Sequence, residues 1–396
     1  MKLAAIKPPR LQTETEGERN ATWLELFYDL VFVATVAMLG IRLAADTSMT
    51  GWFSYAAYFL LVWWLWASHT FYADRYDTDD LVYRFLAGTQ MVAIAILAAS
   101  VATGPAASTA VFAAAYAAAR ILLLLLYARA FKFVPATRQL VRGYLIGFGI
   151  GAAIWVISIF VPEPARFWLW GIALTVDLAT PFIMRKAQAA SPLDVSHLPE
   201  RFGLFTILVL GESIVAVTVG LGHVEWQWGT TIAGIAGLSI ATGLWWIHFD
   251  NVDGRVVRRK GKGRAWQPTV WIYSHLPLAI GLAMVGVGVE HAIVASDQGH
   301  HYTSAERWLL VGGVVLALAA MIGIETASRR DIRDNLRTAL ILSRVVVIAL
   351  ALIIGVVGKL EAPVTVVILA VLCGTLVLTD IVVASAAENQ AAEVSA

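Results

Sequence analysis

Long uninterrupted runs of apolar residues occupy most of this chain and limit what it can fold into. A segment needs roughly 17–25 predominantly apolar residues to cross the hydrocarbon core of a bilayer as a helix. These runs lack the alternating pattern of barrel strands, and a helix satisfies its own backbone hydrogen bonds in lipid. The sequence therefore predicts an all-α, polytopic transmembrane protein of about 12 helices. The expected spans are 22–42, 53–72, 82–103, 107–128, 143–161, 166–184, 203–222, 229–248, 269–293, 307–326, 340–358 and 362–384.

The composition agrees with a membrane protein and argues against several other classes. Of the 396 residues, 59% are hydrophobic and 14% are charged, whereas soluble proteins average about 25% charged residues. The net charge of +1 and the absence of a basic domain give no support for nucleic-acid binding. The single cysteine, Cys373, cannot form an intrachain disulfide or a thiolate metal cluster. No P-loop and no dinucleotide-binding glycine pattern is present, so neither an ATP-driven pump nor a nicotinamide enzyme is predicted.

The positions of the basic residues predict the orientation in the membrane. Most of the 29 Lys and Arg residues precede the first expected helix or follow an even-numbered one. Cytoplasmic loops carry an excess of Lys and Arg, so both termini are predicted to be cytoplasmic. The acidic tail at 387–396 is predicted to be disordered.

Two parts of the chain share a pattern. The pair Trp63-Trp64 recurs as Trp245-Trp246, and the segment GIALTVD at 171–177 is matched by GTLVLTD at 374–380. We therefore predict two six-helix transmembrane repeats, at 1–190 and 195–386. Six is an even number, so the repeats would run parallel to each other. Parallel repeats are a feature of transporters.

Carboxylates inside the expected spans are the first candidates for function, because a charged side chain facing lipid costs several kcal/mol. Glu25 and Asp29 lie one turn apart on the same face of the first helix. Helix-end capping and a salt bridge could alone explain them. Glu25 is expected nearer the surface, and Asp29 is expected to pair with His69 or Arg75. Glu212 lies in the middle of the seventh helix, where a carboxylate must be protonated, paired or hydrated.

A second set of charges lies in later helices. Arg120 either pairs with Asp177 in the interior or extends its head group towards the cytoplasm. Asp177 and Asp380 occupy corresponding positions in the last helix of each repeat. Arg344 is expected to extend to the membrane surface, and Glu325 is expected to form a local pair four residues along its own helix.

One His and several carboxylates end the second helix of each repeat. These residues are His69, Asp74 and Asp77 in the first repeat, and His248 and Asp250 in the second. Oxygen ligands with His suit hard or borderline cations, so a metal site is one interpretation. Solvated loop carboxylates and structural pairs are the alternative. The His residues form no recognisable haem pattern, and although bis-His ligation stays open, no cofactor is predicted.

Three blocks of the sequence resemble a known family. They are ATWLELFYDLVFVATV at 21–36, WASHTFYADRYDTDD at 66–80 and HLPERFGLFTILVLGESIVAV at 197–217. Together they resemble the bacterial low temperature requirement A family over essentially the whole chain. The resemblance implies a multi-pass protein of a bacterial inner membrane, and it implies no particular biochemical activity.

A fainter resemblance is to the endosomal and bacterial proton- and potassium-conducting channels built from six-helix repeats. Those channels carry Phe-Ser-Asp in the first helix and Trp and His near the end of the second. Phe27 and Asp29 flank Tyr28 here, and Trp64 and His69 follow in the next helix. The resemblance implies that Phe27 and Asp29 lie near an ion path, and that a homodimer supplies four six-helix units.

Three functions are open at this point. The first is a channel or carrier for a small cation or proton, with the first and seventh helices nearest the path. A path inside each monomer is the alternative to a shared path in a dimer. The second function is a membrane-embedded enzyme that depends on a metal or haem. The third is a structural or sensory membrane protein without flux. We rank them in this order.

Overall fold

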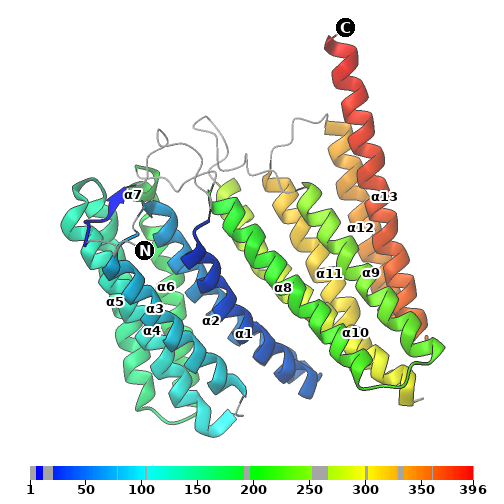
Figure 1. Ribbon diagram of the computed structural model, residues 1–396, viewed down its shortest axis with the longest axis horizontal. Coiled ribbons are helices and arrows are strands. Elements are labelled where there is room, and N and C mark those ends of the chain that lie inside the picture. Colours follow the sequence, from blue (N-terminus) through cyan, green and yellow to red (C-terminus); the bar gives the residue numbers. More distant parts are fainter. Residues whose placement is uncertain are drawn as a thin grey trace. The chain divides into compact units, whose positions relative to one another are not determined.

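The computed structural model describes residues 6–11, 21–77, 79–102, 105–190, 197–251, 266–298, 302–328, 334–358 and 360–395. Within these ranges the chain has thirteen α-helices, a 3-10 turn η2 (Pro135–Thr137), and one two-residue antiparallel pairing of β1 (Arg10–Leu11) with β2 (Tyr76–Asp77) (Figure 1). The helices are α1 (Trp23–Ala45), α2 (Met49–Arg75), α3 (Leu81–Ala102), α4 (Pro105–Phe133), α5 (Arg138–Ile159), α6 (Ala165–Ile183), α7 (Arg185–Ala189), α8 (His197–Gly222), α9 (Trp228–Asn251), α10 (Gln267–Gln298), α11 (Ser304–Ala327), α12 (Asp334–Val357) and α13 (Ala362–Ser395). The predicted all-α class is confirmed.

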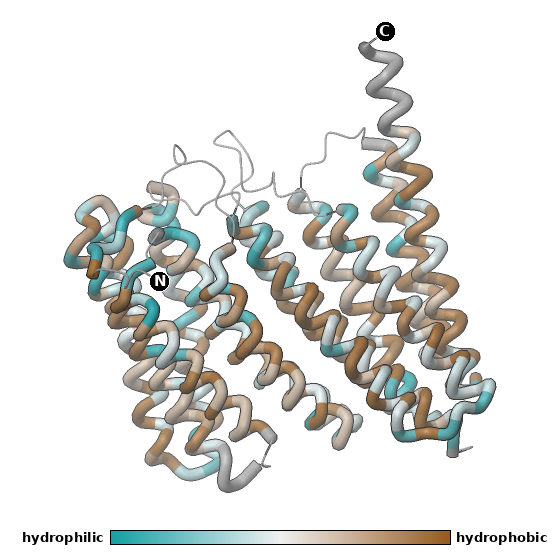
Figure 2. Tube along the Cα trace, viewed as in Figure 1, coloured by the Kyte–Doolittle hydropathy of each residue, from teal (hydrophilic) through white to brown (hydrophobic). Residues whose placement is uncertain are grey.

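Each of the twelve expected spans coincides with one long helix. Apolar residues extend along most of the length of these helices (Figure 2). Ten helices in the described ranges have the length and the mean hydropathy needed to cross a membrane. The protein is therefore an integral, multi-span membrane protein. The two long helices outside that group are α2 and α6, and their crossing of the membrane stays a prediction.

The low hydropathy of α2 has a structural reason. Trp63, Trp64 and Trp66 are completely buried, and so is nearly every side chain from Leu61 to Arg75. A helix that is surrounded by protein can carry polar and aromatic side chains that lipid would disfavour. The helix α2 is thus the central helix of its part of the molecule.

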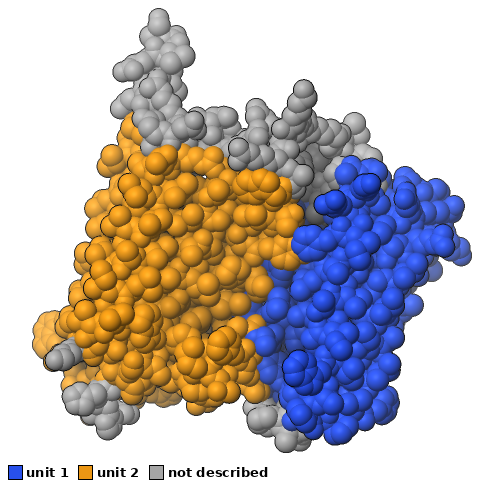
Figure 3. All heavy atoms as spheres, turned by 180° about the vertical axis from the view of Figure 1, so that it is seen from behind, with its two compact units in different colours: residues 1–39, 57–201 blue, residues 40–56, 202–396 orange. Residues whose placement is uncertain are grey.

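The chain forms two compact units (Figure 3). Unit 1 consists of residues 1–39 and 57–201, and unit 2 consists of residues 40–56 and 202–396. The first five residues of α8 therefore belong to unit 1, and the rest of α8 belongs to unit 2. These unit boundaries describe packing, and the six-helix repeats at 1–190 and 195–386 stay a prediction.

Glycines allow the close approach of helices in both units. In unit 1 a Cβ on Gly147 would collide with Thr180, and a Cβ on Gly151 would collide with Asp177, so α5 lies directly against α6. In unit 2 a Cβ on Gly281 would lie 2.7 Å from the backbone nitrogen of Ala317 and from the carbonyl oxygen of Gly313, both on α11. Small residues serve the same purpose wherever helices associate in membranes.

The last helix continues through Ser395. It therefore covers most of the tail at 387–396 that the sequence predicts to be disordered. Disorder of this tail in solution stays a prediction. Cys373, in the middle of α13, is completely buried.

Candidate functional site: a buried ionic cluster in unit 1

Five ionisable side chains gather in the interior of unit 1. They are Glu25 and Asp29 of α1, Asp74 of α2, and His197 and Arg201 from the first turns of α8, and none is more than 1% exposed. We call these five residues the ionic cluster. The consecutive helices α1 and α2 meet the start of α8, which is distant in the sequence, at this point. Burial of a charge is costly unless it is paired and hydrogen-bonded, so the contacts within the cluster decide its chemistry.

Arg201 joins the two carboxylates of α1. Its Nη2 lies 2.5 Å from Oδ1 of Asp29, and its Nη1 lies 3.3 Å from Oε1 of Glu25. The indole Nε1 of Trp66 donates a hydrogen bond of 2.8 Å to the same Oδ1 of Asp29. Because Glu25 and Asp29 are one helical turn apart, a single guanidinium reaches both.

His197 lies between carboxylates of two different helices. Its Nδ1 is 3.2 Å from Oδ1 of Asp74, and its Nε2 is 3.5 Å from Oε2 of Glu25. A neutral imidazole has one N–H and can donate to only one of these two carboxylates. The imidazolium form has two N–H groups and can interact favourably with both. The geometry therefore favours a proton shared within the Glu25, His197 and Asp74 triad.

Glu25 also helps to cap the N-terminus of its own helix. The backbone N–H and the hydroxyl of Thr22 donate to Oε2 of Glu25 at 2.8 and 2.9 Å, and the backbone N–H of Glu25 donates to the Thr22 hydroxyl at 3.3 Å. This reciprocal pattern is a capping box. The expected helix-end role of Glu25 is therefore present, together with its contacts to Arg201 and His197.

One expectation about these carboxylates is wrong. Asp29 contacts Arg201 and Trp66 instead of His69 or Arg75. The ring of His69 stacks on Tyr28 with 4.0 Å between centroids, and Arg75 lies near Tyr76, Tyr127 and Tyr144. Glu25 is only 1% exposed, and its position nearer the membrane surface than Asp29 stays a prediction. The start of α8 supplies the cover and the cations, and spacing along α1 and α2 could not reveal this.

Phe27 does not contribute to the cluster. Its side chain is 56% exposed, whereas its neighbours Tyr28 and Asp29 are buried. A role of Phe27 in an ion path stays a prediction, and the exposed fraction gives it no support.

Arg120 and Asp177 form a separate ion pair in unit 1. The guanidinium Nη2 donates to Oδ1 of Asp177 at 2.7 Å, and both side chains are at most 1% exposed. The Arg120 guanidinium also lies 4.7 Å from the centre of the Phe148 ring. Of the two possibilities left open for Arg120, the interior pair is correct.

Unit 2 contains a comparable group around Arg344. This side chain bonds Glu325 of α11 and lies 3.2 Å from Oδ2 of Asp380 of α13. Arg344 is 1% exposed, so its expected extension to the membrane surface is wrong. This ionic group therefore joins α11, α12 and α13, and the Glu325 carboxylate contacts an Arg on another helix.

Glu212 lies in the unit 2 part of α8, and its side chain is half-buried. Among the described residues no hydrogen bond or ion pair to Glu212 is found. It is thus the one expected path carboxylate that is not held by a cation within the part of the chain that the structure describes. Its functional role stays a prediction.

The metal hypothesis gains no support. The described residues contain no group of three or more His, Cys, Asp or Glu side chains that could hold a metal ion. Asp74 contacts His197, and His69 stacks on Tyr28. The side chain of Asp77 lies outside the described part of the structure. A divalent site at the helix ends stays a prediction.

Within unit 1, a polar contact joins the N-terminal segment 6–11 to Asp80, which lies just before α3. Asp80 is completely buried and accepts hydrogen bonds from Arg129 at 2.6 and 2.8 Å, from the backbone of Lys7 at 3.2 Å and from the backbone of Tyr83 at 3.1 Å. Burial alone would raise the pKa of the Asp80 carboxyl. The hydrogen bonds from Arg129 and from the two backbone N–H groups outweigh burial and hold that pKa below its ordinary value.

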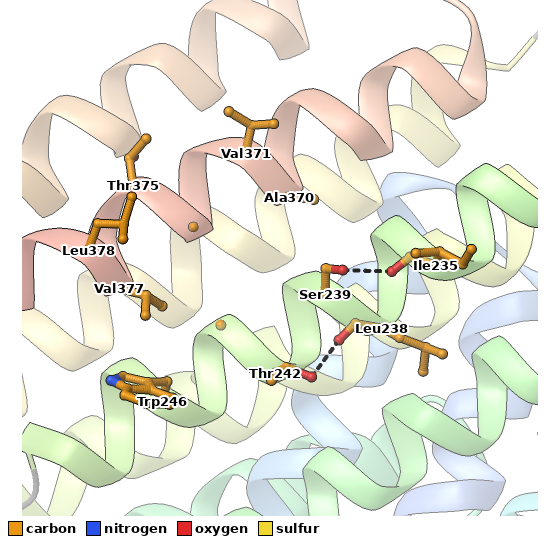
Figure 4. Close-up of a pocket in the computed structure, with 12 residues that line it drawn as sticks. Ile235, Leu238, Ser239, Thr242, Trp246, Ala370, Val371, Thr375, Val377 and Leu378 are labelled. Carbon is orange, nitrogen blue, oxygen red and sulfur yellow. Dashed lines mark hydrogen bonds between the residues drawn. The ribbon is translucent and has the colours of Figure 1, made fainter. Parts of the chain in front are cut away.

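One groove in unit 2 is lined mainly by apolar side chains. This groove of about 710 Å³ lies between α9 and α13 and is bordered by Ile235, Trp246 and Leu378, among others (Figure 4). The hydroxyls of Ser239 and Thr242 in this groove donate to carbonyls of their own helix, at 2.8 and 2.9 Å. The groove therefore presents apolar surface, which suits acyl chains better than a polar substrate.

His197 and Arg201 were not predicted as site residues, although the sequence contains one signal for them. His197 and Arg201 stand in the first turns of α8, where the helix dipole disfavours cations. A buried cation at such a place requires a carboxylate from elsewhere. Glu25 and Asp29 at the start of α1 are carboxylates that meet this requirement.

Comparison with protein-family models identifies one family. A family model described as bacterial low temperature requirement A protein (LtrA) matches residues 20–378. The chain is 27% identical over 334 residues to an uncharacterised protein of Rhizobium meliloti (strain 1021), RA0937, and the match covers 81% of this chain and 80% of that protein. No solved structure matches. All five residues of the ionic cluster lie inside the segment that the family model matches.

Proposed function

The chain belongs to the bacterial low temperature requirement A (LtrA) family, and from this premise we propose that it transports protons or a small cation as a channel or carrier. One observation supports the proposal above all others: the His197 imidazole, at the start of α8, lies between the carboxylates of Glu25, in the first turn of α1, and Asp74, near the end of α2, and all three are buried. Ionisable residues in such helices are expensive to bury, and they commonly mark ion or proton pathways.

Proton transfer suits this arrangement better than binding of a metal cation. Histidine is the side chain whose ordinary titration lies nearest neutral pH. The distances from its two ring nitrogens to Glu25 and Asp74 are 3.5 and 3.2 Å. A proton can therefore pass from one carboxylate through the ring to the other with only small movements of the side chains. Arg201 keeps Glu25 and Asp29 in position while this occurs.

The architecture that we propose contains two parallel six-helix repeats, at 1–190 and 195–386. Asp177 and Asp380 give this idea support, because each lies in the last helix of its repeat and each binds a buried Arg. The Arg comes from α4 in one case and from α12 in the other, so the correspondence is partial. With it we propose cytoplasmic termini, a location in the bacterial inner membrane and a homodimer.

Flux through purified protein in liposomes tests the function. Proton, Na⁺ and K⁺ fluxes would be measured with the wild-type chain, with His197→Gln and with His291→Gln. Gln at 197 can still form hydrogen bonds but cannot become a cation. His291 lies on α10 in unit 2, outside the ionic cluster, so its replacement is the matched control.

We expect the His197→Gln variant to lose at least tenfold in flux and to lose its pH dependence, while the His291→Gln variant keeps both. Full flux in a folded His197→Gln variant would remove the ionic cluster from the pathway. If the wild-type protein is silent with all three ions, the transport function is wrong, and a membrane-embedded enzyme or a structural or sensory protein replaces it.

A further inference from the structure

Two buried histidines form a pair in unit 2, away from the ionic cluster. His248 of α9 and His275 of α10 are 2% and 3% exposed, and their ring centroids are 5.7 Å apart. The Nε2 atom of each ring has no hydrogen-bond partner among the described residues. A buried polar atom without a partner destabilises the folded protein. Two such nitrogens in neighbouring rings therefore call for a shared ligand.

The backbone determines which nitrogen of His275 is available. Its Nδ1 lies 2.8 Å from the carbonyl oxygen of Trp271, and a carbonyl can only accept, so Nδ1 carries the hydrogen. The lone pair of the ring is then on Nε2, the atom without a partner. Histidines that bind metals are commonly oriented in this way, with the second ring nitrogen donating to a carbonyl or carboxylate.

We propose that His248 and His275 bind one soft monovalent cation, Cu(I), through their two Nε2 atoms. A nitrogen–metal distance of about 2.0–2.1 Å on each side places the two ring centres about 6 Å apart, close to the spacing found. Imidazole is a good ligand for copper. Because its d shell is filled, Cu(I) is stable with two ligands in a nearly linear arrangement.

The number of ligands argues against zinc. Structural zinc requires four protein ligands and catalytic zinc requires three. No third His, Cys, Asp or Glu completes a metal-binding group around this pair in the described part of the chain. Two nitrogens alone therefore match Cu(I) better than a divalent ion.

The surroundings favour a single positive charge. The Trp271 ring lies 4.4 Å and the Phe202 ring 4.9 Å from the centroid of His275, and the Phe249 ring lies 4.8 Å from that of His248. Aromatic rings attract cations and exclude water. The cost of burying an ion in an apolar environment rises steeply with its charge, so a monovalent ion is the one that this site can accept.

Binding of Cu(I) to the full-length protein in detergent tests this assignment. The titration would be anaerobic, with ascorbate as reductant and a chromogenic Cu(I) chelator as competitor. We expect one Cu(I) per wild-type chain and at least a tenfold weaker affinity in His248→Asn and in His275→Asn. The control His291→Asn changes a histidine of α10 outside the pair and should keep wild-type affinity.

X-ray absorption on the loaded wild-type protein gives a readout that does not depend on the folding of any variant. We expect two nitrogen ligands with the signature of imidazole, and no sulfur ligand from Cys373. A sulfur ligand, no stoichiometric binding to the wild type, or equal binding by both folded histidine variants would overturn the proposal. In that case a buried water is the partner of the two nitrogens.

Discussion

Removal of Arg201 should be among the most damaging single substitutions in the spans. The side chain is completely buried and contacts two carboxylates, at 2.5 Å for Asp29 and 3.3 Å for Glu25. Arg201→Met has a similar volume but no charge, so both carboxylates lose their guanidinium. Breaking one buried ion pair costs about 3–5 kcal/mol, because it leaves an uncompensated charge. At 1.4 kcal/mol for each factor of ten, the unfolding equilibrium should shift by roughly two to four powers of ten.

The assay is reversible unfolding of purified protein in mixed micelles by increasing SDS, followed by tryptophan fluorescence and circular dichroism. The matched control is Arg84→Met, the same substitution at a surface pair. Arg84 lies 2.6 Å from Asp79, but the two side chains are 45% and 55% exposed. Exposed pairs contribute about 0–1 kcal/mol, so this variant should remain near the wild type.

A double variant separates loss of the pair from loss of packing. In Arg201→Met with Asp29→Asn the buried negative charge at 29 is removed, and the Asn carbonyl can still accept from Trp66. We expect the double variant to be more stable than the sum of the two single effects predicts, by at least about 1 kcal/mol. If Arg201→Met costs no more than Arg84→Met, or if the effects of the double variant are simply additive, the reasoning from buried charge is refuted.

Three further outcomes follow from contacts elsewhere. Asp177→Asn leaves the buried Arg120 without its counter-ion and should cost about 3–5 kcal/mol in the same SDS assay, while an equal stability would contradict the pairing. The pKa of Asp80 is lowered in the folded state, so its carboxylate should stabilise the protein above its unfolded pKa of about 3.9. This contribution should disappear as the pH falls through the folded pKa. The free energy of unfolding of Asp80→Asn should therefore be lower than that of the wild type at pH 7 and equal to it in strong acid. A cysteine placed at Arg138 in a Cys373→Ser background should react with impermeant thiol reagents from the cytoplasmic side only, and labelling from outside would contradict the proposed orientation.

Local pattern was sufficient to predict the helices. Each of the twelve apolar runs became a long helix, because the length of a bilayer span and the need to satisfy the backbone depend only on neighbouring residues. The helices α2 and α6 are not among the ten candidate spans, and for α2 the reason is not local. The helix α2 is enclosed by protein, so its Trp and polar residues can be buried without lipid contact.

The charged contacts divide in the same way. The pair of Arg120 and Asp177 was predictable as one of two possibilities, because these are isolated charges in the fourth and sixth expected spans. The partners of Asp29 could not be predicted, because Arg201 is 172 residues away in the sequence. His69 and Arg75 were expected at the same depth in the membrane as Asp29 and were equally plausible partners. Depth along a helix limits which residues can meet, but only the rotation and the neighbours of the helices select among them.

Of the buried charged groups in the described part of the chain, the ionic cluster is the one that contains a cation able to lose its proton, the His197 imidazolium. The groups around Arg120 and Arg344 each combine a guanidinium with carboxylates, and a guanidinium does not lose its proton in proteins. These groups hold helices together without a change in charge on the cation. Among the described residues, only His197 places an imidazole between carboxylates of α1 and α2, so a single proton alters the contacts that join three helices. That difference in chemistry, rather than the number of buried charges, is why the transport proposal centres on His197.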